Sequence, residues 1–534
     1  MVIRCQIDSI VVRNGRCFGW GWCLDPAQPI AALELEFRGA RGSRATVTCV
    51  PGSRREDVGT DWPRIPHAMH SGFLILGDVP GLALPIEGAR VVIRLRDGTH
   101  CELDLPLQAL AAAGLARDGS GTPLWTRALA KLRRDGLRAT LSRGGDRARA
   151  GLGRMRAWPT RIAWSLRKPS AQVIFDHAMG GGANRFAKGL VERLAAEGRP
   201  VLHVSPVLHD LRYQVAMTWR GDTHAWMVDD VSGVLRLFKP GQSIDVHVNE
   251  LVSFDDPLAV VEWCVSRRGN AGSLTVYVHD FFAACPAWTL IDADNHFCGI
   301  PLDMRVCETC LPRNAANTMG YRGPGIPAWR AAWRRLLERA DTIVAFSAAS
   351  VSLLHRAYPD LSDEAVRIEP HVVAPMTVRF RAPPAGGDIV VGVAGHISIP
   401  KGALMLKEMA AVIRERALPL RIVVFGTLEQ HDEDDGIEVL GEYAHAELPA
   451  LMERHGVSLA FLPSICAETF SFVTAEYMSM GVPTAVFPQG APAERVAGYR
   501  RGLVISNVDA ATAVHEIMEF AAQGFARPPA TREP

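Results

Sequence analysis

The sequence has no apolar run long enough to cross a membrane. Its first ten residues, MVIRCQIDSI, contain no apolar segment of signal-peptide length. No stretch approaches the roughly 18 consecutive apolar residues that a membrane-spanning helix requires. We therefore expect a cytoplasmic protein.

The chain also lacks a strong charge of either sign and a cysteine pattern typical of disulfide frameworks. Its formal net charge is +1 over 534 residues, which argues against a dedicated nucleic-acid binder. The 11 cysteines are an odd number spread through a long chain, so most should be reduced thiols. A hydrophobic fraction of 48% indicates a globular protein, long enough for about three or four domains.

Residues 1–106 alternate between apolar and polar side chains and are interrupted by turn residues, which predicts an antiparallel β-sandwich of about seven or eight strands. In the segment RCFGWGWCL, the side chains of Phe18, Trp20 and Trp22 share one strand face. If exposed, this row would be a stacking platform for sugar rings; if buried, it would be core. We favour the core, because aromatic side chains bury the most area per residue.

Residues 107–168 show no strand pattern and carry an excess of positive charge, which predicts a basic helical connector. Within it, residues 124–168 have a basic amphipathic pattern. Such a segment could lie on anionic lipid at the inner face of a membrane, or it could be a solvated linker helix. Both interpretations remain open.

A different organisation begins at Ala171 and predicts a first Rossmann-like domain over residues 169–380. The run AQVIFDHAM reads as a buried strand, GGGAN as a turn, and a helix and the strand PVLHVSP follow. Gly181 and Gly182 would allow a ligand to approach the backbone at the helix N-terminus. The alternative is a tight turn that only lets the helix pack on the sheet. The GxGxxG pattern is missing, so dinucleotide binding is not supported.

The strand Ser273–Val278 ends at His279. Because ligands bind at the carboxyl ends of parallel strands, His279 is a candidate site residue. The alternative is a core histidine whose hydrogen bonds are satisfied.

The insertion at residues 285–310 is rich in turn residues and poor in periodicity, so it needs additional stabilisation to be ordered. Its C-x2-C spacing suits two ligands of one tetrahedral ion, so we expect a structural zinc site rather than four reduced thiols. We expect no catalytic metal, since four cysteines leave no open coordination position. The four candidate ligands are Cys285, Cys298, Cys307 and Cys310.

A second Rossmann-like domain is predicted over residues 388–522, followed by a tail at 523–534. It opens with the strand DIVVGVAG, and a glycine-x5-lysine pattern joins Gly395 to Lys401. A lysine there could neutralise a diphosphate leaving group.

The segment LAFLPSICAETFSFVTAEYMSMGVP reads as strand, loop and helix. Glu468 lies in the loop, the helix begins near Ser471, and Glu476 follows eight positions after Glu468. Both carboxylates should point to the edge of the sheet where ligands bind.

This spacing, together with ETFSF, GVP and GAPAER, resembles the E-x7-E element of retaining glycosyltransferases of family GT4. The resemblance covers Ala171–Ala522. It implies an α/β fold of GT-B type, with two Rossmann-like domains, here preceded by the β-sandwich. It also implies transfer of a sugar, with retention, from a nucleotide-sugar donor to a hydroxyl of a glycan or lipid-linked acceptor. The sequence does not choose between UDP and GDP donors.

The resemblance further implies roles for individual residues. Glu468 and His279 would orient the sugar, Lys401 would hold the diphosphate, and Glu476 would bind the ribose. His396 stands where the family usually has arginine, so one fixed positive charge is lost or depends on pH. The remaining residues implied to border the donor or the acceptor are Gly395, Gly181, Gly182, Tyr443, Phe470 and Ser471.

Two other functions are compatible with the sequence. One is a nucleotide-sugar epimerase of GT-B fold. The other is a glycan-binding or scaffold protein with a degenerate donor site, which His396 and the added β-sandwich make credible. For the transferase, we expect an acceptor from bacterial surface polysaccharide synthesis, such as lipopolysaccharide.

Overall fold

The computed structural model describes residues 3–53, 55–106, 108, 110, 170–239, 241–267, 272–314, 325–376, 387–431 and 434–526. The chain forms two compact units, one up to Ser273 and one from Leu274 onward. Apart from residues 108 and 110, the predicted basic connector at 107–168 lies outside the described residues. No helix in the described parts of the chain is long and apolar enough to cross a membrane.

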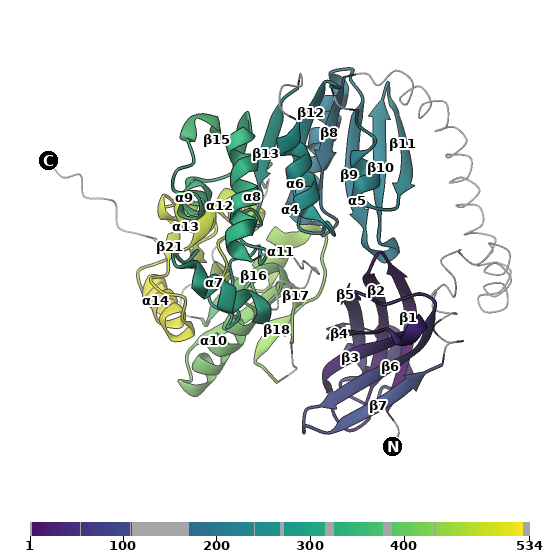
Figure 1. Ribbon diagram of the computed structural model, residues 1–534. Coiled ribbons are helices and arrows are strands. Elements are labelled where there is room, and N and C mark those ends of the chain that lie inside the picture. The colour runs from purple at the N-terminus through teal and green to yellow at the C-terminus, as the bar shows by residue number, and fades with distance from the viewer. Residues whose placement is uncertain are drawn as a thin grey trace. The chain divides into compact units, whose positions relative to one another are not determined.

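The N-terminal residues form one antiparallel sheet with the strand order β1-β2-β5-β4-β3-β6-β7 (Figure 1). The predicted all-β domain is confirmed, but one continuous sheet replaces the two packed sheets of a sandwich. Its strands are β1 (Arg4–Arg13), β2 (Arg16–Leu24), β3 (Ile30–Gly39), β4 (Arg44–Ser53), β5 (Gly72–Asp78), β6 (Ile86–Leu95) and β7 (His100–Leu105).

This single sheet encloses its own core because it bends. The pairing register shifts between Ile7 and Ser9 on β1 and between Pro51 and Ser53 on β4. Such bulges increase the local twist and bend the strand. Side chains of six strands, Phe37 and Phe73 among them, therefore meet in one buried cluster. The alternating sequence predicts which face each strand buries, but not which strands pair.

The row Phe18, Trp20 and Trp22 does not face this core. The favoured interpretation, burial of the row, is wrong for Trp20, whereas Trp22 packs on a separate small buried cluster. On β2 the core side is formed by the alternate residues, including Cys17 and Cys23. Trp20 is 40% exposed. Glycine is required between the aromatic residues: a Cβ on Gly19 would lie 2.4 Å from the carbonyl oxygen of Ser9 on β1, and Gly21 is equally restricted. Small residues thus occupy the core side, and the aromatic residues take the outer side.

The remainder of the first unit is an α/β arrangement. Its strands have the order β11-β10-β9-β8-β12, and β8 pairs in parallel with both β9 and β12. The strands are β8 (Ala171–Phe175), β9 (Val201–Val207), β10 (Arg212–Trp219), β11 (Asp222–Val228) and β12 (Ile244–Val248). The helices are α4 (Gly181–Ala196), α5 (Val231–Leu235) and α6 (Pro257–Ser266).

The second unit contains two sets of parallel strands. The first comprises β13 (Leu274–Val278), β14 (Thr342–Ala345) and β15 (Val366–Ile368). The second has the order β18-β17-β16-β19-β20-β21. Its strands are β16 (Ile389–Ile397), β17 (Leu420–Leu428), β18 (Ile437–Val439), β19 (Leu459–Leu462), β20 (Thr484–Val486) and β21 (Gly502–Val504). The helices include α7 (Met304–Cys310), α8 (Ile326–Arg339), α9 (Ala348–Ala357), α10 (Ala403–Glu415), α11 (Leu448–Arg454), α12 (Phe472–Met480), α13 (Gly490–Ala497) and α14 (Ala510–Ala522).

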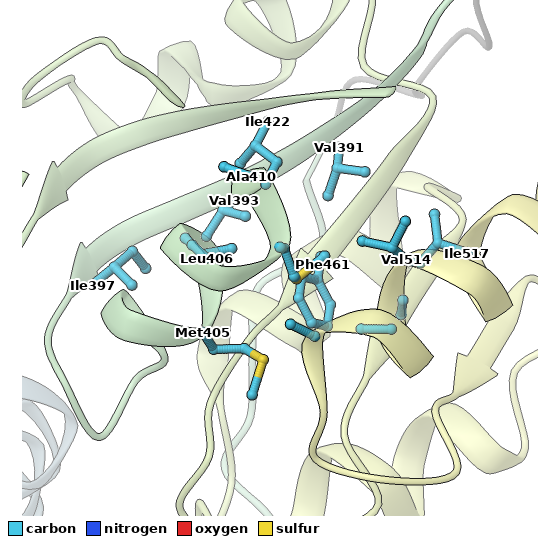
Figure 2. Close-up of a cluster of buried hydrophobic side chains, with 14 of the residues drawn as sticks. Val391, Val393, Ile397, Met405, Leu406, Ala410, Ile422, Phe461, Val514 and Ile517 are labelled. Atoms are coloured by element: carbon cyan, nitrogen blue, oxygen red, sulfur yellow. The ribbon is translucent and has the colours of Figure 1, made fainter. Parts of the chain in front are cut away.

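The six-stranded sheet is covered on both faces, which explains its nearly continuous apolar strands. On one face, Leu406 of α10 and Val514 of α14 pack against Val393 and Phe461 (Figure 2). On the other face, Tyr477 of α12 belongs to a second buried cluster. The predicted fold class, α/β with parallel sheets behind an all-β domain, is confirmed.

Candidate functional site

Three aromatic rings lie at the carboxyl ends of the neighbouring strands β13, β14 and β15. The ring of Phe346 stacks on His279, with centroids 4.6 Å apart, and on His371, with centroids 4.0 Å apart, and the two histidine rings are themselves stacked 5.8 Å apart. Burial lowers the pKa of His371 to about 4, so this imidazole is neutral at neutral pH. The candidate His279 thus belongs to a group of stacked rings, which we call the aromatic wall.

The loop after β19 carries Glu468 and is fixed by several hydrogen bonds. The Glu468 carboxylate accepts a hydrogen bond from the Ser464 hydroxyl, and its carbonyl oxygen accepts one from the Ala491 amide at 2.8 Å. Gly490 makes this approach possible, since a Cβ there would lie 2.6 Å from the Glu468 carbonyl oxygen. Ser471 caps α12 with a positive φ of 69°, an uncommon conformation that the surrounding structure must hold.

A hydrogen bond joins this loop to the aromatic wall. The Thr469 hydroxyl donates to the carbonyl oxygen of His279 at 2.7 Å, although the two residues are 190 positions apart. The rings of Phe470 and Phe472 also meet His371, with centroids 4.8 and 5.1 Å apart. The structure therefore brings together two elements that the sequence predicts separately, the end of β13 and the glutamate loop.

Glu476, on α12, is 6% exposed and has a close polar partner. Its Oε1 lies 2.8 Å from Nε2 of His445, which begins the short helix η7 (His445–Glu447). Burial, reinforced by the Glu476 carboxylate, raises the pKa of Tyr443 to about 12. Glu476 and Tyr443, both predicted nucleotide-binding residues, are therefore neighbours.

The segment before α10 lies against the same loop. The carbonyl oxygen of Pro400 accepts hydrogen bonds from the amides of Ile465 and Cys466 at 3.1 and 3.3 Å. Burial raises the pKa of the Cys466 thiol to about 12; the nearby Glu468 carboxylate adds to this effect, whereas Lys401 opposes it. Both candidate charged groups therefore act on the half-buried Cys466 thiol.

The strand ends beside Lys401 are formed by glycines. Gly395 of β16 pairs with Gly426 of β17, and Gly426 bridges to Gly441. A Cβ on Gly426 would lie 2.0 Å from the carbonyl oxygen of Gly395, whereas a Cβ on Gly395 or Gly441 would meet nothing within 4 Å. The backbone edge is thus open to a ligand. His396 is exposed and its Nδ1 lies 2.5 Å from Oγ1 of Thr427.

Gly181 and Gly182 lie in the first turn of α4, where Gly181 has a positive φ of 80°. The buried Asp176 carboxylate holds this loop, because it accepts hydrogen bonds from Asn184 and Asn249 at 2.7 and 2.8 Å. This loop belongs to the first unit. Its predicted meeting with Glu468 and Lys401 therefore stays a prediction.

The predicted structural zinc is not supported. Among the residues that the structure describes, no three His, Cys, Asp or Glu side chains form a group that could hold a metal ion. Cys307 lies 3.8 Å from the Arg330 guanidinium, and Cys310 lies 3.4 Å from the Asn314 amide. All eleven cysteines are free thiols.

Hydrogen bonds from later parts of the chain hold the loop that leads into the insertion. From α8, Trp329 Nε1 donates to the carbonyl oxygen of Phe282 at 2.9 Å, and Arg330 Nε donates to that of Ala284 at 3.0 Å. The Tyr358 hydroxyl donates to the carbonyl oxygen of Ala283 at 2.6 Å. Loop carbonyl groups that would otherwise be buried without partners are thereby satisfied.

Several site residues were missed from the sequence. His371 and Phe346 follow strand ends, so the rule that selected His279 could have found them. Thr469 could not have been found in this way, because its importance depends on a contact with a distant strand. His445 has no motif that distinguishes it from a surface histidine.

Comparison with known proteins gives a partial match. Residues 388–523 match the family model described as glycosyl transferases group 1, and no curated protein matches the chain. Sucrose-phosphate synthase from Thermosynechococcus elongatus is 16% identical, with a TM-score of 0.43 and coverage of 67% of this chain and 91% of that one. Anabaena HepE in complex with UDP and glucose is 14% identical, with a TM-score of 0.40 and coverage of 66% and 90%. The lipopolysaccharide outer core galactosyltransferase WaaB is 11% identical, with a TM-score of 0.38 and coverage of 67% and 91%. The group 1 glycosyl transferase match includes the segments that carry Lys401, Glu468 and Glu476.

Proposed function

We propose that this protein is a retaining glycosyltransferase of the GT4 type. It transfers a sugar from a nucleotide-sugar donor, of UDP or GDP type, to a hydroxyl of a glycan or lipid-linked acceptor in bacterial surface polysaccharide synthesis. The observation that carries the proposal is the position of the group 1 glycosyl transferase match, which includes the glutamate loop that Thr469 joins to His279.

The proposed chemistry needs a stabilised leaving group and a fixed sugar. Lys401, with the open glycine edge beside it, would neutralise the diphosphate as the glycosidic bond breaks. Glu468 and His279 would hold the sugar hydroxyls, while Glu476 and Tyr443 would hold the nucleoside. The acceptor hydroxyl then attacks from the side of the leaving phosphate, which takes its proton, so the configuration at the anomeric carbon is retained.

The proposed setting is the cytoplasmic side of a membrane. Lipid-linked acceptors are found there, and residues 124–168 would make the peripheral contact with anionic lipid. The rival function is a glycan-binding or scaffold protein with a degenerate donor site. It is favoured by His396, which stands in place of the family's arginine and is engaged with Thr427.

Thermal unfolding in the presence of a panel of UDP- and GDP-sugars tests the proposal directly. A donor that binds only the folded state raises the melting temperature in proportion to its affinity. We expect stabilisation of the wild type by one class of donor. Glu476→Ala should weaken donor binding by about 10- to 100-fold, since hydrogen bonds to charged groups contribute about 1.5–3 kcal/mol.

Kinetics with the stabilising donor separate the roles of the two charged residues. Lys401→Ala should mainly lower kcat, because its charge acts most strongly as the leaving group forms. Glu415→Ala, on the exposed side of α10, is the control and should leave both constants unchanged. Wild-type affinity and rate in both the Glu476→Ala and Lys401→Ala variants would contradict the proposal.

A further inference from the structure

The outer face of the N-terminal sheet is divided into two chemically different halves. Over β3, β6 and β7 it is charged, as expected for a solvent-facing strand surface. Arg90 pairs with Glu102 at 2.5 Å and with Asp104 at 3.2 Å, and Glu34 and Glu36 lie on the neighbouring strand. This charged half therefore gives no reason to expect a binding partner.

The half over β1, β2, β5 and β4 has an apolar centre. Trp20 pairs with Leu74 on β5, which in turn pairs with Val50 on β4, so the three side chains form a row across the strands. Phe18 pairs with Leu76 in the adjacent row. We call these five residues the tryptophan face. Val50 is 50% exposed and Trp20 is 40% exposed, so the face is open to solvent.

The exposure of the tryptophan face is not a defect in the packing of the protein core. Trp22, in the same aromatic row, is covered: its ring lies 5.4 Å from that of Trp62, which follows α1 (Glu56–Asp61), and both pack on a small buried cluster with Leu24. The ring of Trp20 meets that of Phe18 edge-on, with centroids 5.9 Å apart and planes at 67°, and Trp20 stays 40% exposed. The fold therefore covers one tryptophan and leaves the next accessible. Contiguous exposed apolar patches of this kind usually mark interaction sites.

From this arrangement we infer that the tryptophan face binds a chain of pyranose sugars. A pyranose ring presents C–H groups on its flat faces and hydroxyls around its edge, so it suits an exposed indole flanked by hydroxyl side chains. Ser9 pairs with Trp20 from β1, and Thr48 lies two residues before Val50 on β4. None of the five residues of the face is charged, which disfavours nucleic acid and anionic lipid as the partner.

The strand that carries Trp20 is also well fixed. Because Gly19 and Gly21 lie directly against the β1 backbone, β2 cannot shift away from β1 without losing its register. A fixed platform reduces the entropy lost on binding. The inference rests on the proposed function, since the sugar chain would be a glycan acceptor. It assigns that acceptor a second site, outside the donor-binding residues.

Native gel electrophoresis of the full chain tests the inference, using gels that contain dextran, galactomannan or hydroxyethylcellulose. Wild-type protein should be retarded in at least one gel. Trp20→Ala should bind about tenfold more weakly, as expected for loss of one aromatic contact and its buried area. Trp20→Tyr should restore most of the binding, and Trp20→Leu should not, because a sugar needs a flat ring. Glu102→Ala, on the charged half, is the control and should behave as wild type.

Three results would overturn the inference: no retardation of the wild type in any gel, equal binding by the Trp20→Leu and Trp20→Tyr variants, or Trp20-dependent flotation with phosphatidylglycerol vesicles. The second result would indicate an apolar protein partner, and the third a membrane. The donor-induced thermal shift, measured for the wild type and for Glu476→Ala, tests the transferase proposal independently of the glycan site. If no nucleotide sugar stabilises the wild type but retardation still depends on Trp20, the transferase proposal fails and the glycan site stands.

Discussion

At the scale of single residues, the half-buried His371 and the buried His247 couple folding to pH. His371 lies in the aromatic wall, and His247 lies on β12 with its Nε2 3.0 Å from Oε1 of Gln172. Burial lowers the pKa of each from an ordinary value of 6.5 to about 4. Both imidazoles are therefore neutral in the folded protein at neutral pH.

We predict that the melting temperature falls as the pH is lowered from about 6.5 to about 4. In this window the unfolded chain binds more protons at these two positions than the folded chain, so acid favours unfolding. The contribution is fully present above pH 6.5 and is lost as the pH approaches the folded-state pKa. His371→Phe keeps the stack but removes the titrating group, so its melting temperature should fall by several degrees less over this range. Identical pH profiles for wild type and variant would contradict this explanation.

Residues at strand ends were the most predictable part of the site. His279 follows the mostly apolar run LTVYV, so a buried parallel strand and its ligand-binding edge could be read from the sequence. His371 follows β15, which has only three residues and is half exposed, so its strand gives a weak signal. Thr469 has no local signal, because its hydroxyl acts on a carbonyl group 190 residues away.

At the scale of secondary-structure elements, Gly402 fixes how the Lys401 segment meets the glutamate loop. It has a φ of 93°, and a Cβ there would lie 2.1 Å from the carbonyl oxygen of Pro463. Gly481, at the end of α12, has a φ of 78° and open space around its Cβ position. Substituting each glycine by alanine therefore distinguishes the cost of a positive φ, present at both positions, from the cost of a steric clash, present only at Gly402.

We predict that Gly402→Ala costs more stability than Gly481→Ala and also impairs donor binding. Gly481→Ala should lose about 1–2 kcal/mol, the cost of a left-handed conformation for a residue with a Cβ. Gly402→Ala carries that cost plus the clash, and it displaces the loop that holds Glu468. Denaturant unfolding and donor-induced thermal shifts measure the two effects. Equal losses in both variants would show that the loops can separate freely.

We predict that α8 stabilises the loop leading into the insertion, and that no metal ion stabilises the insertion. Arg330→Met should lower the free energy of unfolding by about 1.5–3 kcal/mol, because the hydrogen bond of a charged donor to the Ala284 carbonyl group is lost. Arg335→Met, on the exposed side of the same helix, is the control. Incubation with a chelator should leave the melting temperature unchanged. A fall in the melting temperature on chelation would revive the zinc hypothesis.

The predictions of a zinc site and of a buried Trp20 failed for the same reason: each depends on contacts with another segment of the chain. Cysteine spacing shows which thiols can share a metal, but not that Arg330 and Asn314 contact two of them. Alternation along β2 shows that Trp20 and Gly19 face opposite sides, but not which side is core. That choice depends on the bulge of β1, which lies too close to β2 for any Cβ at Gly19 or Gly21.

At the scale of the whole molecule, the second unit joins two long chain segments. The Thr469 hydroxyl bonds to the end of β13, and the carboxylate of Glu494 on α13 accepts hydrogen bonds from the amides of Ala348 and Ala349 at the start of α9. The latter contact also places a negative charge at a helix N-terminus, which is favourable.

We predict that Thr469→Val slows sugar transfer and lowers stability, whereas Thr469→Ser behaves nearly as wild type. Valine has almost the same shape but leaves the His279 carbonyl group without its partner, at a cost of about 1–3 kcal/mol. The expected kinetic effect is on kcat, because His279 is displaced while the nucleotide-binding residues are not. Thermal unfolding and steady-state kinetics test this. A Thr469→Val variant with normal kcat would show that the position of His279 is not critical.

The overall class of the fold was predictable because apolar periodicity changes along the chain, from period two before residue 106 to buried strands alternating with helices after residue 171. Pairing between distant strands was not predictable, since many partners satisfy the same pattern. This is why seven strands were expected as two sheets and are found as one.

The hydrogen bond between Thr469 and His279 also has a consequence for synthesis. At about 5–20 residues per second, a ribosome makes Thr469 roughly 10–40 s after His279, given their separation of 190 residues. During that interval β13, and then Phe346 and His371 once they are made, exist without the loop that completes them. The nascent chain thus exposes a sheet edge lined with histidine and phenylalanine, a surface suited to chaperones that bind apolar segments.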